Sequence, residues 1–338
     1  MFRIFSFVSV LLFCFGIVGA NSFSEREMLV VAADGVEMGA TLTLPDNRNL
    51  CKAAIVLATG SGTQNRDEEI MGKRPFKTIA EFLSDNGYAV LRVDDRGYAN
   101  PKDAAGATED TYSADVASAV ALMDSIFPDM KIGIIGHSSG GGYAIRNAAH
   151  NSTVDFIVTL AAPAWSGDSV VMSQSRAMAV AMTGRWDAEP LQRKILDVAK
   201  SQASDMSART LLSMTLGEAL GEMSQLPQVQ KQIFAQIDGV MSPWYRSMLR
   251  YDPADDIRLI KVPFLALNGS KDTQVLPGNL ATIKEVNPQV TVREIEGHNH
   301  LFQPCSTGLV QEYASLPGDI SATTLRIILE WLDRMVNQ

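Results

Sequence analysis

The stretch Ile135-Gly136-His137-Ser138-Ser139-Gly140-Gly141 decides how this chain is expected to fold. It continues an apolar run at 132–135, which predicts a buried strand, and it leads into a predicted helix at 140–149. Glycine loses more backbone entropy than other residues on folding, so glycines on both sides of Ser138 indicate a turn too tight for larger side chains. The pattern G-x-S-x-G between a strand and a helix is typical of a turn that exposes a nucleophilic serine.

A dinucleotide-binding loop is the main alternative for a glycine-rich turn at this point. Its G-x-G-x-x-G spacing fails from Gly136, because Ser138 stands where a second glycine is required. Counted from Gly140, the third glycine position holds Ile145. A glycine-rich turn without chemistry is the other alternative, and the remaining motifs argue against it.

Strand and helix patterns alternate on both sides of this turn. Repeated β–α units predict a mostly parallel central sheet with helices on both faces. The alternation lapses over 164–251, which is predicted to be helical and is rich in methionine. We therefore expect two core parts, 21–163 and 252–338, with 164–251 inserted between them as a helical cap. The predicted strands are a hairpin within 28–44 and the runs 53–58, 88–93, 132–135, 154–160, 262–267 and 290–295.

The first twenty residues are typical of an export signal. A short basic start precedes the apolar run 4–18, and Val18-Gly19-Ala20 supplies the small residues of a cleavage site. The sequence predicts a signal peptide at 1–20 and an exported, periplasmic or extracellular protein without stable membrane insertion after cleavage. An N-terminal membrane anchor is the alternative, although the run is short for spanning a bilayer.

Composition narrows the possible partners. The chain has 338 residues, 20% of them charged, and a formal net charge of −9. This acidic balance without a basic stripe argues against nucleic acid as a partner. After the predicted signal peptide is removed, the cysteines of the chain are Cys51 and Cys305, and we expect them to be unpaired. Four histidines without a cysteine–histidine cluster predict no metal site, and no cofactor is expected.

A nucleophilic serine needs a base, and the base needs a carboxylate that orients it. Hydrolases with this turn place these residues in the chain order serine, acid, histidine. Asp272 follows the predicted strand 262–267, where the acid is expected. His298 and His300 both follow the strand 290–295, and spacing alone leaves the choice between them open.

Acyl transfer also needs two N–H donors for the oxyanion that develops on the substrate. The backbone N–H of Ser139, directly after the nucleophile, is one candidate. The second is expected in the loop after strand 53–58, where we choose Ser61, with Gly62 next. A plain glycine turn is the alternative for this loop.

At these motifs the chain resembles the secreted or cytosolic bacterial esterases of the α/β-hydrolase superfamily, and the resemblance covers nearly all of the mature chain. It implies Ser138 as nucleophile, Asp272 as acid and His300 as base in place of His298, which we then expect to lie in solvent. The segments that carry the resemblance are GSGTQNRDEE (60–69), DDRG (94–97), GHSSGG (136–141), LNGSKDTQV (267–275) and NHLFQ (299–303).

The resemblance also guides the reading of the charged loop and of the cap. It places Arg66, Asp67 and Glu68 near the oxyanion site, and we expect them to brace one another. By analogy with relatives, Trp244 and Tyr245 are candidates for lining the substrate pocket. Methionine suits an adaptable pocket, but we expect the cap methionines to be mainly core residues.

The sequence thus predicts an α/β-hydrolase that cleaves a small-molecule carboxylic ester through an acyl-enzyme. The same triad also serves peptidases and thioesterases, because fold does not decide substrate. The alternative from another class is a non-catalytic exported binding protein that keeps the fold.

Overall fold

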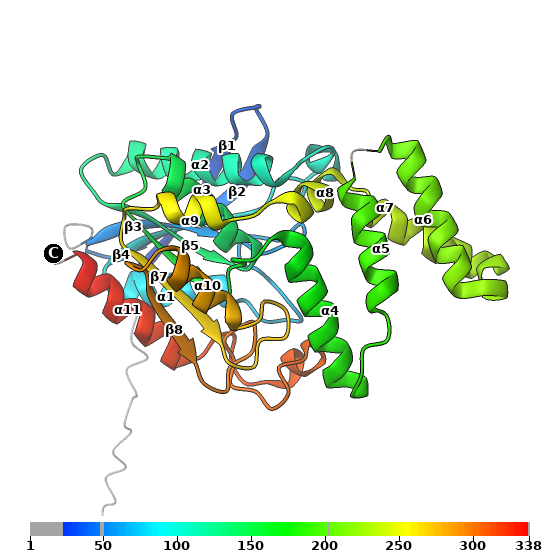
Figure 1. Cartoon of the computed structure of the whole chain (residues 1–338). Coiled ribbons are helices and arrows are strands. Elements are labelled where there is room, and N and C mark those ends of the chain that lie inside the picture. Colours follow the sequence, from blue (N-terminus) through cyan, green and yellow to red (C-terminus); the bar gives the residue numbers. More distant parts are fainter. Residues whose placement is uncertain (1–22, 48–50, 202, 337–338) are drawn as a thin grey trace, which may run out of the picture.

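The computed structural model describes residues 23–47, 51–201 and 203–336 (Figure 1). The expected signal peptide at 1–20 lies outside these ranges. Within them, no helix combines the length and the apolar character that crossing a membrane requires.

Eight strands form one sheet in the order β1-β2-β4-β3-β5-β6-β7-β8. The first two strands form the predicted hairpin and run antiparallel at one edge, while the strands from β4 to β8 in this order pair in parallel. The strands are β1 (Phe23–Val31), β2 (Glu37–Pro45), β3 (Ala53–Ala58), β4 (Tyr88–Val93), β5 (Ile132–His137), β6 (Phe156–Leu160), β7 (Phe264–Gly269) and β8 (Thr291–Ile295).

Helices cover both faces of this sheet, which is why its central strands are apolar throughout rather than alternating. One face carries α1 (Pro75–Asp85) and α11 (Ala322–Val336) (Figure 1). The opposite face carries four helices, α2 (Glu109–Ile126), α3 (Ser139–His150), α9 (Ala254–Leu259) and α10 (Gly278–Val286).

Strand β3 shows how the two cores are separated. All six of its residues are buried. Ile55 and Leu57 belong to the core under α1 and α11, whereas Ala54 and Val56 belong to the core on the other face. Successive side chains of a strand point to opposite faces, so one short apolar run supplies both cores.

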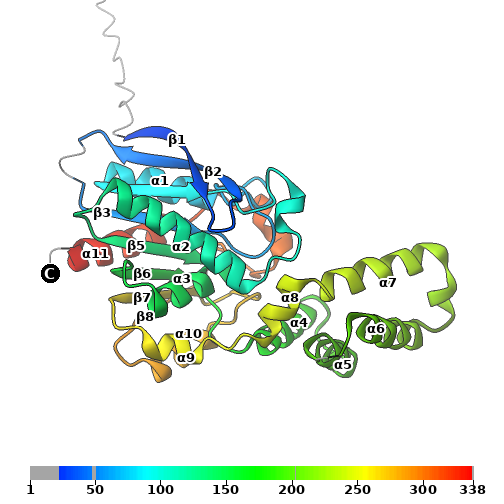
Figure 2. The ribbon, with the colours of Figure 1, turned by 90° about the horizontal axis from the view of Figure 1, so that it is seen from above.

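Between β6 and β7 the chain forms a group of helices with an apolar core of its own. This core includes Ile195, Leu212, Ile233 and Ile237. Helices α6 and α7 extend away from the sheet, and α8 connects the group to the main body (Figure 2). The helices are α4 (Gly167–Thr183), α5 (Glu189–Lys200), α6 (Asp205–Leu220), α7 (Pro227–Val240) and α8 (Pro243–Arg250), with a 3₁₀ turn at Gly221–Gln225. Two further 3₁₀ turns lie at Pro101–Ala104 and Val310–Ser315.

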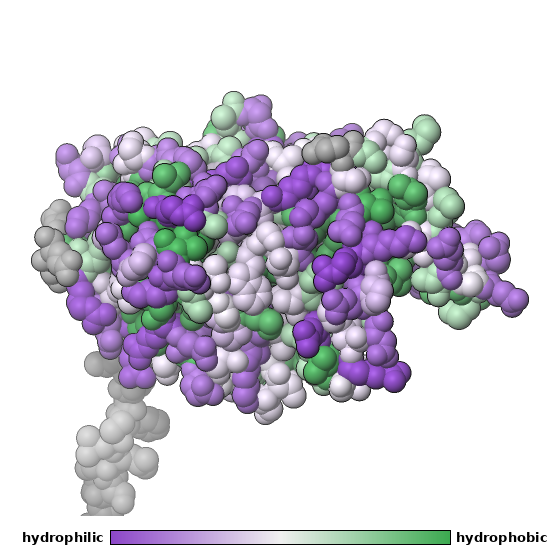
Figure 3. Space-filling model, viewed as in Figure 1, coloured by the Kyte–Doolittle hydropathy of each residue, from purple (hydrophilic) through white to green (hydrophobic). Residues whose placement is uncertain are grey.

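The prediction that the cap methionines are mainly core residues is wrong for several of them. Met206 is 81% exposed, and Met182, Met214 and Met223 are each more than half exposed. Met241 is buried in the small core of the cap. Within the described residues, the main contacts of α6 and α7 are with other cap helices, and Met206 and Met214 are exposed side chains of α6. Apolar side chains are accordingly visible on this part of the surface (Figure 3).

Candidate active site

The turn between β5 and α3 holds Ser138 in a backbone conformation that residues other than glycine rarely adopt, with φ of +52°. A Cβ on Gly136 would lie 2.2 Å from the carbonyl oxygen of Gly140. A Cβ on Gly140 would lie 2.0 Å from the carbonyl oxygen of Ala58 in β3. The predicted tight turn is confirmed, and only glycine fits at either position.

Asp272 and His300 lie in the loops after β7 and β8 and are joined by a hydrogen bond of 2.7 Å between Oδ2 and Nδ1. The other oxygen of Asp272 accepts the backbone N–H groups of Gln274 and Val275 at 2.8 and 3.0 Å. Since the Asp272 carboxylate accepts these bonds, Nδ1 of His300 carries a proton and Nε2 is left to accept one. Both side chains are buried.

Ser138 lies beside the loop that carries His300. The rings of His137 and His300 are 4.6 Å apart between centroids, and Nε2 of His137 lies 3.0 Å from the backbone oxygen of His300. Within the described residues, the Ser138 hydroxyl forms no hydrogen bond to His300. Such bonds are often long in ligand-free proteins and shorten when substrate binds.

The expectation that His298 lies in solvent is wrong, because only 7% of the residue is exposed. Its Nδ1 lies 2.7 Å from the backbone oxygen of Glu296, and its Nε2 lies 2.9 Å from the hydroxyl of Ser321. Both ring nitrogens are therefore engaged within the loop and at the start of α11. The structure joins His300, and not His298, to the carboxylate of Asp272.

The loop around His300 is held by a pair of buried amides that sequence reasoning did not identify. Asn299 donates its backbone N–H to the backbone oxygen of Gln303 and accepts the Gln303 N–H on its side chain, at 3.1 and 2.9 Å. Neither residue is exposed. The amides explain why Asn299 and Gln303 bracket the histidine in the motif NHLFQ.

Two backbone N–H groups at Ser138 are free to bind an oxyanion. Those of Ser61 and Ser139 have no partner among the described residues, and both residues line the same cavity as Ser138. The N–H of Gly60 is occupied, since it donates to Oε1 of Glu68 at 2.7 Å. Either predicted donor therefore has an available N–H.

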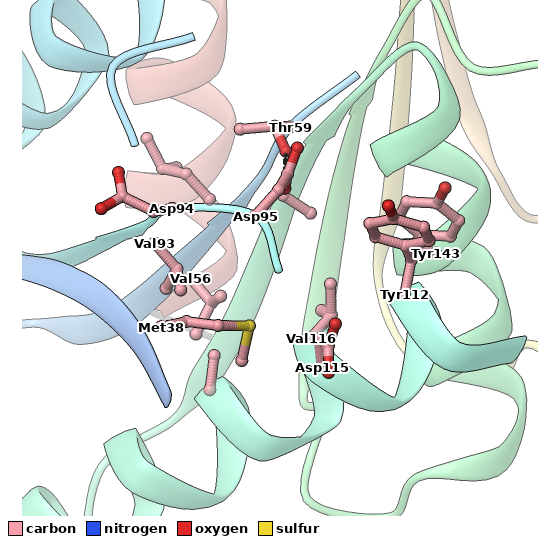
Figure 4. Close-up of a pocket in the computed structure, with 13 residues that line it drawn as sticks. Met38, Val56, Thr59, Val93, Asp94, Asp95, Tyr112, Asp115, Val116 and Tyr143 are labelled. Atoms are coloured by element: carbon pink, nitrogen blue, oxygen red, sulfur yellow. Dashed lines mark hydrogen bonds between the residues drawn. The ribbon is translucent and has the colours of Figure 1, made fainter. Parts of the chain in front are cut away.

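The loop that carries Ser61 is held by Asp95, which belongs to the segment DDRG (94–97) directly after β4. The carboxyl of Asp95 accepts the Thr59 hydroxyl at 2.5 Å (Figure 4). It also accepts the backbone N–H of Gln64 at 2.8 Å. Burial raises the pKa of Asp95 to about 7. Asp95 thus holds both ends of the turn that presents Ser61.

The expectation that Arg66, Asp67 and Glu68 brace one another is wrong. Arg66 donates two side-chain hydrogen bonds to Asp94, at 3.1 and 2.8 Å. Asp67 pairs with Arg92 of β4. Each of these side chains ties the loop to another segment, a pairing that spacing along the chain does not indicate.

Glu68 is fully buried and contacts His137. Its Oε1 lies 2.8 Å from Nδ1 of His137, whose Nε2 donates to the backbone oxygen of His300. Burial disfavours the charged imidazole, but the charge of Glu68 and its hydrogen bond, the bond to the His300 backbone and the charge of Asp272 together outweigh burial and raise the pKa of His137. Through this pair, the backbone of Gly60 is connected to the backbone of His300. The connection passes through His137, which directly precedes Ser138.

A cavity of about 250 Å³ opens beside Ser138. Trp244 and Tyr245 of α8 lie in its wall, as expected. Glu109, Gly142 and Tyr251 also line the cavity. Elsewhere in the described ranges, Cys51 and Cys305 are both free, and no group of three or more possible ligands could hold a metal ion.

The family model described as serine aminopeptidase, S33 matches residues 73–302, which is more than half of the chain. The chain belongs to this family. Two solved structures agree with the α/β-hydrolase fold. Est1E from Butyrivibrio proteoclasticus has a TM-score of 0.56 at 14% identity, covering 92% of this chain and 99% of that one. An esterase of Pyrococcus furiosus has a TM-score of 0.55 at 15% identity, covering 93% and 92%.

Among curated proteins, Esterase EstD of Thermotoga maritima is 23% identical over 285 residues. The match covers 84% of this chain and 58% of that protein, so the chain spans little more than half the length of this relative. The solved structures, at their low identities, show the fold alone. The predicted fold class, a mostly parallel sheet with helices on both faces, is confirmed.

Replacing Gly140 by alanine is expected to destabilise the fold by about 3 kcal/mol or more, because the added carbon meets the backbone of β3. Gly142 is the matched control, since a Cβ there meets only Tyr251 at 4.0 Å. Since alanine is more stable than glycine inside a helix, Gly142→Ala is expected to raise the free energy of unfolding by up to about 1 kcal/mol. Urea unfolding of both variants measures the difference, and equal stabilities would contradict the account of the turn.

Replacing Glu68 by glutamine removes the negative charge that helps to raise the pKa of His137 and weakens the contact between the two side chains. We expect the rate at which a fluorophosphonate labels Ser138 to fall by about 10- to 100-fold, as for the loss of roughly 1–3 kcal/mol of buried hydrogen bonding. The side chain of Glu69 is 48% exposed, and Glu69→Gln is the control. A labelling rate unchanged in folded Glu68→Gln protein would assign Glu68 a purely structural role.

Proposed function

We propose that this protein is a serine hydrolase that cleaves carboxylic esters through an acyl-enzyme. The observation that carries the proposal is the Asp272–His300 hydrogen bond of 2.7 Å, in the loop that contacts the residue preceding Ser138. The strained turn exposes Ser138 to a cavity of substrate size. The family match and the esterase names of its relatives support the same reaction class.

In this mechanism Ser138 Oγ attacks the ester carbonyl carbon while Nε2 of His300 takes the hydroxyl proton. The C–O bond to the alcohol then breaks, and His300 returns the proton to the departing alcohol. A water molecule repeats the sequence on the acyl-enzyme and releases the acid. Asp272 holds the ring in the tautomer that leaves Nε2 free to accept.

The oxyanion formed in each step binds to the backbone N–H groups of Ser61 and Ser139. Ser139 is the first residue of α3, so the positive end of the helix dipole adds to its N–H. Asp95 and Glu68 hold the loop before substrate arrives, and this lowers the reorganisation needed at the transition state.

The predicted signal peptide at 1–20 supports an exported enzyme, periplasmic or extracellular. The cavity of about 250 Å³ supports a small-molecule substrate. The triad would also serve a peptidase, which the family description names, or a thioesterase.

Replacing Ser138 by alanine is expected to lower hydrolysis of p-nitrophenyl esters, from acetate to decanoate, by about four to six orders of magnitude. Fluorophosphonate labelling of the protein should disappear as well. Ser125→Ala, which removes an exposed serine of α2, is the control. If the unmodified protein is labelled at Ser138 but does not hydrolyse these esters, a peptide or thioester substrate is favoured. If the unmodified protein shows neither labelling nor hydrolysis, a binding protein is favoured.

Replacing Trp244 by alanine enlarges the cavity at α8 and removes the hydrogen bond from its indole to the Tyr143 hydroxyl. We expect the best acyl chain in the p-nitrophenyl series to become longer, mainly through a lower KM for long esters. Trp186, which does not line this cavity, supplies the matched Trp186→Ala control. An unchanged chain-length profile would remove Trp244 from the substrate site.

A further inference from the structure

The cavity beside Ser138 contains a buried carboxyl that the ester mechanism does not use. Glu109 is the first residue of α2, yet it is only 5% exposed. It lines the same cavity as Ser138 and the aromatic side chains of α8. Its Oε1 is buried and has no hydrogen-bond partner among the described residues. A buried acceptor without a partner is costly, so its retention needs an explanation.

The position of the Glu109 side chain is fixed by its surroundings. Its backbone N–H donates to the hydroxyl of Ser247 in α8 at 2.9 Å. The indole N–H of Trp244 donates to the hydroxyl of Tyr143 at 3.0 Å, which leaves the Tyr143 proton free for the Glu109 carboxyl. Tyr143 is itself stacked on Tyr112 (Figure 4). The Glu109 backbone is therefore tied to α8, and its carboxyl lies near the Tyr143 hydroxyl.

The charges around Glu109 favour an uncharged group as its missing partner. No basic side chain of the described residues forms an ion pair with it. Arg146 of α3 pairs with Asp110 at 2.6 Å and lies over the ring of Tyr251, and its positive charge acts on Glu109 from nearby. Burial raises the pKa of Glu109 to about 8, although Arg146 and hydrogen bonding from Tyr143 oppose this effect. A neutral carboxyl next to an arginine suits a hydroxyl better than an ammonium group.

We propose that Oε1 of Glu109 accepts a hydrogen bond from a hydroxyl group of the substrate, so that this site selects uncharged esters that carry a hydroxyl away from the scissile bond. The inference rests on the proposed function and names its substrate class. The cavity of about 250 Å³ has room for such a group. For comparison, a cavity of about 150 Å³ holds a benzene molecule.

The selectivity follows from what a substrate without the hydroxyl leaves behind. A substrate with the hydroxyl gives Oε1 of Glu109 the partner that it lacks in the free protein, whereas a substrate without it leaves this buried acceptor unpaired. Sites built to pair a substrate hydroxyl reject the analogue that lacks it more strongly than apolar pockets reject a missing methylene. We expect a preference of about 10-fold or more in kcat/KM.

Two series of matched esters test this preference and locate the hydroxyl. The first compares p-nitrophenyl ω-hydroxyalkanoates, from hexanoate to octanoate, with the alkanoates and ω-ammonium alkanoates of equal length. The second compares the monoacetates of linear diols with the alkyl acetates of equal length. The first series places the hydroxyl on the acyl side and the second on the alcohol side.

Glu109→Met replaces the carboxyl by an apolar chain of similar length and should abolish or reverse the preference for the hydroxylated ester. Glu109→Gln keeps an acceptor and should retain part of it. Asp124→Asn removes an exposed carboxylate from the same helix and is the matched control. Urea unfolding of each variant separates a change in selectivity from a loss of folded protein.

Titration calorimetry of the Ser138→Ala protein with the same ester pairs gives the affinity ratio without turnover. Tighter binding of the hydroxylated ester, lost in Ser138→Ala/Glu109→Met, supports the inference even if the esters prove to be poor substrates. Equal or tighter binding of the plain or the ammonium ester overturns it. Absence of turnover by the unmodified protein, by contrast, counts against the proposed function alone.

Discussion

The arrangement of this active site depends on how closely three segments of backbone approach one another at Ser138. Gly140 in the first turn of α3 lies against the carbonyl of Ala58, and Gly136 at the end of β5 lies against Gly140. This contact brings β3 and β5 to the same point at the edge of the sheet, and the loop that carries Ser61 continues directly from β3. Ser138 and the N–H groups that we propose for the oxyanion are thus placed by a single packing constraint.

Buried hydrogen bonds of carboxyl groups carry that constraint into the surrounding loops. Asp95 holds the turn at Ser61, while Glu68 joins the same loop to His137. His137 in turn donates to the backbone of His300. Because charged and hydrogen-bonded groups are costly to leave unpaired in the interior, each of these contacts discourages movement of the next. The loops at this edge therefore behave as one connected unit rather than as separate loops.

The parts of this site that were predictable from the sequence are those set by local chain geometry. The tight turn at Ser138 and the succession of strands follow from glycine spacing and apolar runs, and that succession gives the loop positions of Asp272 and of two candidate histidines. The choice of His300 over His298 comes from the resemblance to a family. The partners of Arg66 and Glu68 were not predictable, because they are chosen by contacts between segments distant in sequence. Glu109 carries no local signal, since its burial depends on α8, which begins at Pro243. The burial of His298 likewise depends on Ser321.

The cap has a small apolar core that is separate from the two cores on the faces of the sheet. Helices α6 and α7 bury apolar side chains against one another and against one side of α5, whereas the turn at Ser138 is supported by the sheet and its covering helices. A local opening or a substitution within the outer cap therefore removes few contacts from the catalytic loops. A change in the length or composition of the outer cap therefore leaves the backbone packing around Ser138 intact, whereas a change at Gly136 or Gly140 disturbs it directly.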